Sequence, residues 1–191
     1  GCIDTPHRLA QIANGVCLFA WGLGYTDRNI ADRIGTTLKP IPRRHRAAIT
    51  DPEKVGGLLR RIRGYTGAGL SVKYCLNILP YLPLRSEEIR LARWEEIDLE
   101  NAVWTIPGKR NEHGGGMKMR VAHTVPLARQ VVDLFRELKN IREMNGGGEL
   151  CFPSPRSASR TITAEGLLAA LRDMGYSKEE MSIHGFRTIF S

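Results

Sequence analysis

The sequence predicts a mostly α-helical protein of the α+β class, with one small antiparallel β-sheet inserted among the helices. Apolar residues recur three and four positions apart on both sides of the middle of the chain, which is the spacing of a buried helix face. The middle itself, at 102–106 and 121–125, is rich in residues that favour strands. A glycine-rich stretch at 111–116 separates these two runs and predicts a hairpin. Helices, a small sheet and helices again are the order expected of such a domain.

Residues 1–45 are expected to form the end of a larger helical module. A helical pattern runs from about 5 to 35, interrupted by glycines, with a short second helix predicted at 27–34. Two helices bury little apolar surface by themselves, so we expect further helices before them. The stretch 39–46 contains two prolines and a basic run. It predicts a linker that passes over a phosphate backbone or, alternatively, a solvated basic loop.

Residues 46–191 are expected to form the main domain. Its first helix has a strong start, because Thr50 or Asp51 can cap it and Pro52 suits the first helical position. The further helices and strands are predicted at 70–82, 86–94, 102–106, 121–125, 127–144, 164–174 and from 183 onward.

The composition favours a polyanionic partner. Lys and Arg number 28 against 20 Asp and Glu, a formal net charge of +8, for which nucleic acid is the natural partner and a solvated charged face the alternative. The four cysteines form no Cys-x-x-Cys pair, which argues against a zinc site or a disulfide framework and favours reduced thiols in a cytoplasm. No apolar run is long enough to span a bilayer, and the start is no signal peptide. The first residue is not Met, so we expect the chain to begin at a cut in a longer protein.

Two basic residues in the main domain are suited to a phosphate. Arg85 precedes the predicted helix at 86–94, whose N-terminus also favours an anion, and Glu88 can hold its guanidinium. Lys118 lies on the predicted hairpin and, unlike an arginine, can give up a proton inside a closed site. The alternatives are a surface capping pair and an exposed hairpin lysine.

His184-Gly185-Phe186-Arg187 is the most specific local motif. A histidine can donate or accept a proton near neutral pH, and an arginine can grip two phosphate oxygens at once. We expect Phe186 to face the core, which would place His184 and Arg187 on the opposite side. A lone His-x-x-Arg occurs often by chance, but with Arg85 and Lys118 upstream it predicts a cluster around one phosphate.

In this order the motifs resemble the tyrosine recombinase (phage integrase) family, and within it the prophage and genomic-island integrases. The resemblance covers the chain from about residue 50 to the end. Residues 1–45 are similar to the last helices of the SAM-like core-binding domain that precedes the catalytic domain in that family. The matching stretches are 85–89 with 92–99, 104–107, 117–120, 123–127, 152–156 and 183–187.

The resemblance implies site-specific DNA recombination or integration by a mobile element, through strand breaking and rejoining. Arg85 and Arg187 would neutralise the charge that builds on the scissile phosphate. Lys118 would protonate the departing 5′ oxygen, and His184 would assist proton transfer at the attacking oxygen, with Glu88 in support. A tyrosine would form a 3′-phosphotyrosyl intermediate. No metal and no cofactor are implied, because the cations belong to the protein.

The implied partner is double-stranded DNA with an attachment-site-like sequence, and the parent protein would self-associate on that DNA. The implied location is the bacterial cytoplasm, at the nucleoid. The candidates for further DNA contacts are Arg43, Arg44, Arg46, Lys109, Arg110 and Arg120.

The chain departs from the family pattern in three places. The nucleophilic tyrosine should lie downstream of Arg187, yet all five tyrosines lie upstream, so we expect a chain that binds DNA but cannot cleave it alone. Prolines within 79–84 should end a helix early. Glycines at 114–116 lengthen the hairpin that must aim Lys118. The alternatives are an inactive DNA-binding remnant, a domain that binds RNA or a small phosphorylated ligand, and, more distantly, a type IB topoisomerase.

Overall fold

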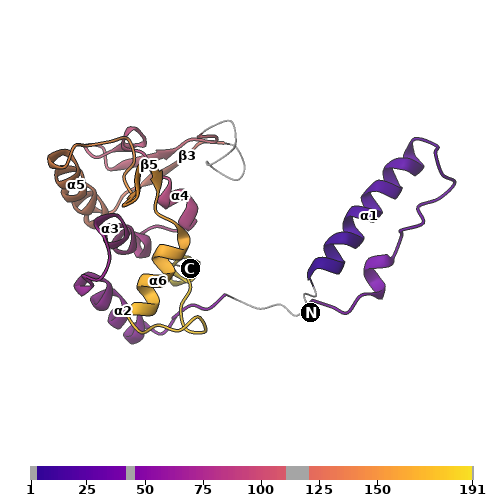
Figure 1. Ribbon diagram of the computed structural model, residues 1–191, viewed down its shortest axis with the longest axis horizontal. Helices are drawn as coiled ribbons and strands as arrows, with labels where there is room; N and C mark the ends of the chain where they lie inside the picture. Colours follow the sequence, from indigo (N-terminus) through magenta and orange to yellow (C-terminus); the bar gives the residue numbers. More distant parts are fainter. Residues whose placement is uncertain (1–3, 42–45, 111–120, 191) are drawn as a thin grey trace. The chain divides into compact units, whose positions relative to one another are not determined.

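The structure is a computed structural model that describes residues 4–41, 46–110 and 121–190 (Figure 1). The chain divides into two compact units, Gly1–His45 and Arg46–Ser191, and each is described by itself. The assignment of the first unit to a core-binding domain stays a prediction.

The first unit contains the helix α1 (Asp4–Gly22) and the 3-10 helix η1 (Ile34–Thr37). The predicted helix at 27–34 is wrong, because this stretch forms turns. The side chain of Asn29 accepts a hydrogen bond from the backbone N–H of Ala31 at 3.0 Å, a local bond that competes with helix formation. Arg33 has a φ of 65°, which is left-handed backbone and marks the end of the turn before η1.

The apolar residues of α1 have few partners within this unit. Leu9, Val16 and Phe19 are each more than half exposed, although they recur at the spacing of a buried helix face. The expectation that this helix belongs to a larger helical module is in keeping with that exposure, and it stays a prediction.

The second unit holds most of the regular structure. Its first helix begins where the sequence predicts, since the Asp51 side chain accepts from the backbone N–H of Lys54 at 3.0 Å and Pro52 opens the helix. α3 packs against both α5 and α6 (Figure 1). The helices and 3-10 turns of this unit are α2 (Pro52–Gly64), α3 (Leu70–Ile78), η2 (Leu79–Tyr81), α4 (Ser86–Arg90), η3 (Trp94–Glu96), α5 (Arg129–Met144), α6 (Ala164–Asp173) and α7 (Gly185–Ile189).

Two helices are shorter than predicted. α3 ends at Ile78 and continues only as the 3-10 turn η2, since Pro80 has no N–H to donate to a further α-turn. α4 is five residues long and stops well before Trp94. Arg93 there pairs with Leu150 as an isolated bridge, and the N–H of Trp94 donates to the carbonyl of Glu149 at 3.0 Å. Contacts with a distant segment therefore decide where α4 ends.

The sheet has three antiparallel strands in the order β1-β2-β3: β1 (Ile97–Asp98), β2 (Val103–Ile106) and β3 (His123–Pro126). Trp104 in the middle strand lies opposite Ile97 on one side and Val125 on the other. A separate hairpin pairs β4 (Pro153–Ser154) with β5 (Ser157–Thr161). The sequence did not predict β1, β4 or β5, because two-residue strands and a polar five-residue strand show no alternation of apolar residues.

An aromatic cluster joins the sheet to α5. Phe135 of α5 meets Trp104 edge-on at 6.0 Å between ring centroids and lies 6.1 Å from Phe152. All three rings are fully buried. The predicted class, mostly α with a small antiparallel sheet, is confirmed. In the described part of the chain, no helix has both the length and the apolar character that crossing a membrane requires.

Candidate phosphate site

Arg85 stands at the start of α4 and is held there by Glu88. The backbone N–H of Arg85 donates to Glu88 Oε2 at 2.7 Å, which is one half of a capping box. The Arg85 guanidinium donates from Nη1 to Glu88 Oε1 at 2.8 Å. The Glu88 side chain is buried, whereas the Arg85 side chain keeps 41% of its surface exposed. Glu88 therefore orients Arg85 and leaves part of the guanidinium open to a partner in solution.

The His-x-x-Arg motif lies at the start of α7. His184 occupies the N-cap position of this helix without a capping hydrogen bond from its side chain, Phe186 is 1% exposed and faces the core, and Arg187 is half-buried. His184 itself is exposed. The predicted orientation of Phe186 is confirmed. α7 also packs against η2, which precedes Arg85 by four residues, so the two motifs lie on neighbouring segments.

The electrostatics of His184 show which cations surround it. Its pKa is lowered from the ordinary 6.5, first by partial burial and then by the positive charges of Arg46, Arg187 and Arg85 in that order. These residues come from three stretches that are far apart in the sequence. A histidine with a lowered pKa is neutral at pH 7 and can accept a proton. Three positive charges thus act on one proton acceptor, with no acidic group among the causes of the shift.

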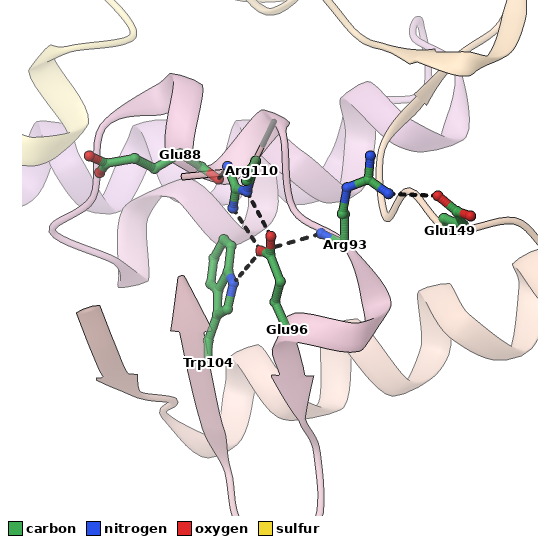
Figure 2. A network of polar contacts seen from close by, with 6 residues as sticks. All are labelled: Glu88, Arg93, Glu96, Trp104, Arg110 and Glu149. Carbon is green, nitrogen blue, oxygen red and sulfur yellow. Dashed lines mark hydrogen bonds and ion pairs between the residues drawn. The ribbon is translucent and has the colours of Figure 1, made fainter. Parts of the chain in front are cut away.

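Arg110 is the residue for which the sequence prediction of a DNA contact is wrong. Its side chain is 4% exposed, because it forms a buried ion pair with Glu96: Nε donates to Oε1 and Nη2 to Oε2, both at 2.7 Å. Figure 2 shows the same carboxylate accepting from the indole N–H of Trp104 at 3.0 Å. A guanidinium that is enclosed and paired in this way cannot reach a DNA backbone.

The Arg110 network also holds α4. Arg110 Nη1 donates to the backbone carbonyl of Glu88 at 3.1 Å, while the Glu88 carboxylate points away from the cluster (Figure 2). Arg93, at the edge of the network, pairs with Glu149 at 2.6 Å. Neither Glu96 nor Trp104 was predicted as part of this support, and no spacing in the sequence marks them out, since their pairing with Arg110 is a tertiary contact.

The remaining candidates divide into two groups. Lys109 is exposed next to the buried Arg110, and Arg46 is exposed at the start of the second unit. The other candidates lie outside the described residues, and so does the predicted glycine-rich hairpin turn; these candidates are Arg43, Arg44, Lys118 and Arg120.

The tyrosines of the second unit have other partners. Tyr65 donates to Asp173 at 2.6 Å, and Tyr81 accepts from Arg63 at 2.9 Å. The guanidinium of Arg61 lies over the ring of Tyr176. Tyr74 is buried, and burial followed by the Glu137 carboxylate raises its pKa to about 12. A raised pKa disfavours the phenolate, which is the opposite of what an activated nucleophile needs.

The buried cysteines of the second unit are not reactive thiols, and the described residues hold no metal-binding group. Burial raises the pKa of the Cys75 thiol to about 12, and that of Cys151 is also raised, so neither is a reactive thiolate at neutral pH. Over the ranges that the structure describes, no group of three or more His, Cys, Asp and Glu side chains is placed to hold a metal ion.

A mostly α domain with a small sheet and a cluster of arginines around a histidine is an arrangement suited to a polyanionic phosphate. The chain belongs to the phage integrase family, the tyrosine recombinases, since the model described as "Phage integrase family" matches residues 53–191.

Related proteins support that membership. The integrase of Enterobacteria phage P4 is 35% identical over 97% of this chain and 43% of its own length. The putative protein IntB of Escherichia coli (strain K12) is 33% identical over 99% of this chain and 48% of its own length. The chain therefore spans about half the length of the curated relatives that it matches.

Solved structures show the same fold at low sequence identity. The Tn1549 transposon integrase in complex with a circular intermediate DNA covers 98% of this chain at a TM-score of 0.74 and 15% identity, over 65% of its own length. The lambda integrase dimer bound to a COC′ core site covers 98% of this chain at a TM-score of 0.66 and 12% identity, over 51% of its own length.

Proposed function

We propose that the chain is the phosphate-activating part of a tyrosine recombinase that breaks and rejoins double-stranded DNA at specific sites. The observation that carries this proposal is that Arg85, held by Glu88 at the start of α4, and the His184–Arg187 motif at the start of α7 lie on neighbouring segments, because α7 packs against η2. The positive charges of Arg46, Arg187 and Arg85 also act on His184. The relative from phage P4 is an integrase by name, one similar structure is a complex with a circular intermediate DNA, and another is bound to a core site. The net charge of +8 suits the same partner.

The roles of the residues follow from their chemistry. Arg85 and Arg187 stabilise the charge on the scissile phosphate as a tyrosine oxygen attacks phosphorus and the bond to the 5′ oxygen breaks. His184, neutral at pH 7, accepts the proton of the attacking hydroxyl. Lys118 donates a proton to the departing 5′ oxygen, and Glu88 positions Arg85 through the bond at 2.8 Å.

The DNA backbone is the partner of the remaining exposed cations. We assign further phosphate contacts to Lys109 and Arg46, which are exposed, and to Arg43, Arg44 and Arg120 on the strength of their charge. An attachment-site-like target sequence, self-association on that DNA and a location at the nucleoid in the bacterial cytoplasm belong to the same proposal.

A second candidate function is DNA binding without strand cleavage. It is favoured by the tyrosines, because four of the five have structural partners or a buried ring and Tyr25 belongs to the first unit. In that case the arginine cluster holds a phosphate but no hydroxyl of this chain attacks it.

Covalent complex formation on a nicked suicide duplex tests both candidates. The 191-residue chain and the parent protein that contains it are incubated with the duplex and separated under denaturing conditions. We expect an adduct from the parent protein alone, and we expect Arg85→Gln to slow its formation strongly while Arg129→Gln, at an exposed arginine outside the cluster, does not. An adduct on the 191-residue chain would contradict our inference that none of its tyrosines is the nucleophile. Binding by the parent protein without any adduct would select the second candidate.

A further inference from the structure

The segment that opens the second unit packs directly against the His-x-x-Arg motif. We call residues 46–50 the Arg46 segment. The carbonyl oxygen of Ala47 accepts two hydrogen bonds from Ser182, from the backbone N–H at 3.1 Å and from Oγ at 2.8 Å. Ile49, further along, packs against the hydrophobic core. The segment is therefore fixed at two points, one of them two residues before His184.

Gly185 makes this close packing possible. A Cβ at position 185 would lie 2.6 Å from the Ala47 carbonyl oxygen and 3.1 Å from the Ala48 Cα, and real Cβ atoms essentially never approach backbone atoms at the shorter distance. The N–H of Gly185 donates to Ser182, to its carbonyl at 2.9 Å and to its Oγ at 3.1 Å. Ser182 thus ties the Arg46 segment and the start of α7 to each other through one hydroxyl.

This packing adds the positive charge of Arg46 to the surroundings of His184. Arg46 directly precedes the carbonyl-bound Ala47, and its side chain is exposed. Among the charged groups that lower the pKa of His184, Arg46 ranks before Arg187 and Arg85. Arg46, which lies outside the stretches that match the family pattern, therefore acts on His184 together with the two motif arginines.

We propose that Arg46 is a DNA-phosphate-binding residue of the His184 site, and that Ser182 and Gly185 are positioning residues that hold it there. The proposal rests on the proposed function for its ligand, a backbone phosphate of duplex DNA. The placement of Arg46 beside His184 is independent of that function. The two parts are tested separately.

The first test needs no DNA. The imidazole of His184 is titrated by NMR in the 191-residue chain and in Arg46→Gln, with His184→Asn used to assign the signal. We expect the pKa of His184 to rise in Arg46→Gln, because a positive charge that opposes protonation is removed. Arg129→Gln, which removes an exposed arginine that is not among the causes of the His184 shift, is the matched control and should leave that pKa unchanged. An unchanged pKa in Arg46→Gln would overturn the proposal.

The second test moves the segment without changing any charge. Gly185→Ala must displace Ala47, so we expect the pKa of His184 to rise as it does in Arg46→Gln, with little further change in the double variant. Gly57→Ala is the control, because a Cβ at position 57 meets nothing within 4 Å. Ser182→Ala, which removes one of the two bonds to Ala47, gives a milder displacement and replaces Gly185→Ala if that variant does not fold. Additive shifts in the double variant would exclude Gly185 and Ser182 as positioning residues.

The third test adds duplex DNA and measures affinity by fluorescence anisotropy over a range of salt concentrations. We expect Arg46→Gln to lower the slope of log affinity against log salt by about one, the value for one lost phosphate contact. Gly185→Ala should lower it by a similar amount, and Gly57→Ala should leave it unchanged. A slope equal to that of the wild type in Arg46→Gln would remove Arg46 from the DNA interface. If the wild-type chain does not bind duplex DNA, the proposed function fails, whereas the placement of Arg46 is still decided by the two tests without DNA.

Discussion

Two arginine–glutamate pairs meet at helix α4, and they differ in exposure far more than in geometry. The Arg85–Glu88 and Arg110–Glu96 pairs have N–O distances of 2.8 and 2.7 Å. The Arg85 side chain is 41% exposed and the Arg110 side chain 4%. Arg110 uses three nitrogens within the protein, two on Glu96 and one on the Glu88 carbonyl.

The difference in exposure indicates that Arg85 can bind a ligand, whereas Arg110 supports the fold around α4. Arg85 binds its carboxylate through Nη1 and through its own backbone N–H, so part of the guanidinium remains for a ligand. Arg110 is buried, and three of its nitrogens already donate to protein oxygens, so it cannot bind a ligand. It instead fixes the backbone of a helix that is only five residues long and that depends on tertiary contacts for its place. The buried pair thus supports the exposed one.

The largest effect is expected from breaking the buried pair. Arg110→Met leaves the buried Glu96 carboxylate without its cation, and the expected loss in the free energy of unfolding is about 3–5 kcal/mol. Urea denaturation of the 191-residue chain measures it. The control is the double variant Arg110→Met with Glu96→Leu, which removes both charges and should recover most of the loss. A loss in the single variant below about 1 kcal/mol, as for a surface pair, would contradict this assignment.

Breaking the exposed Arg85–Glu88 pair is expected to change the reaction rate far more than the stability. Arg85→Gln should lower the rate of covalent adduct formation by the parent protein about 10²–10³-fold, the usual cost of one lost donor to a developing charge. The free energy of unfolding should fall by no more than about 1 kcal/mol, because Arg85 is partly exposed and the backbone bond to Glu88 remains. Single-turnover kinetics and urea denaturation of the same preparation separate the two quantities. If the free energy of unfolding fell as far in Arg85→Gln as in Arg110→Met, the lower rate would reflect a less stable fold, and Arg85 would be a structural residue like Arg110.

The smallest effect is a pH dependence from His184. Because its folded-state pKa is lowered, the unfolded chain binds the proton first as the pH falls through 6.5. The stability contributed by the neutral imidazole is therefore complete above pH 6.5 and is lost as the pH falls towards the folded-state pKa. We expect His184→Asn to lose less stability than the wild type between pH 7.5 and 5.5, measured by urea denaturation at both values. The same pH dependence in both proteins would show that neither burial nor the arginines lower the pKa of His184.

Much of the fold could be predicted from the sequence, because helices of the second unit have apolar spacing and good caps. Asp51 and Pro52 set the start of α2 as expected. The errors have physical causes. α4 was predicted too long because Arg93 and Trp94 bind the distant segment at 149–150, and the helix at 27–34 was predicted where Asn29 forms a local turn. Such contacts leave no periodic pattern in the chain.

Some features of the candidate site could also be predicted from the sequence, and others could not. The Arg85–Glu88 contact and the inward side chain of Phe186 follow from helical spacing, so they could be predicted. Arg110 was predicted as a DNA contact and is instead buried, because an arginine beside a predicted turn has the same sequence environment whether it is exposed or buried. Arg46 was predicted as a basic linker residue, but its place beside His184 depends on Ser182 and Gly185, which are more than 130 positions away in the sequence.

The missing side chain of Gly185 has a consequence for how this motif evolves. Written as His-x-x-Arg, the motif leaves its second position unrestricted. In this fold the Ala47 carbonyl oxygen lies 2.6 Å from where a Cβ would stand, so any larger residue at 185 requires a different path for residues 47 and 48. Positions 47, 48 and 185 should therefore vary together among related chains, and a motif search for chains with this packing gains selectivity if it requires glycine after the histidine.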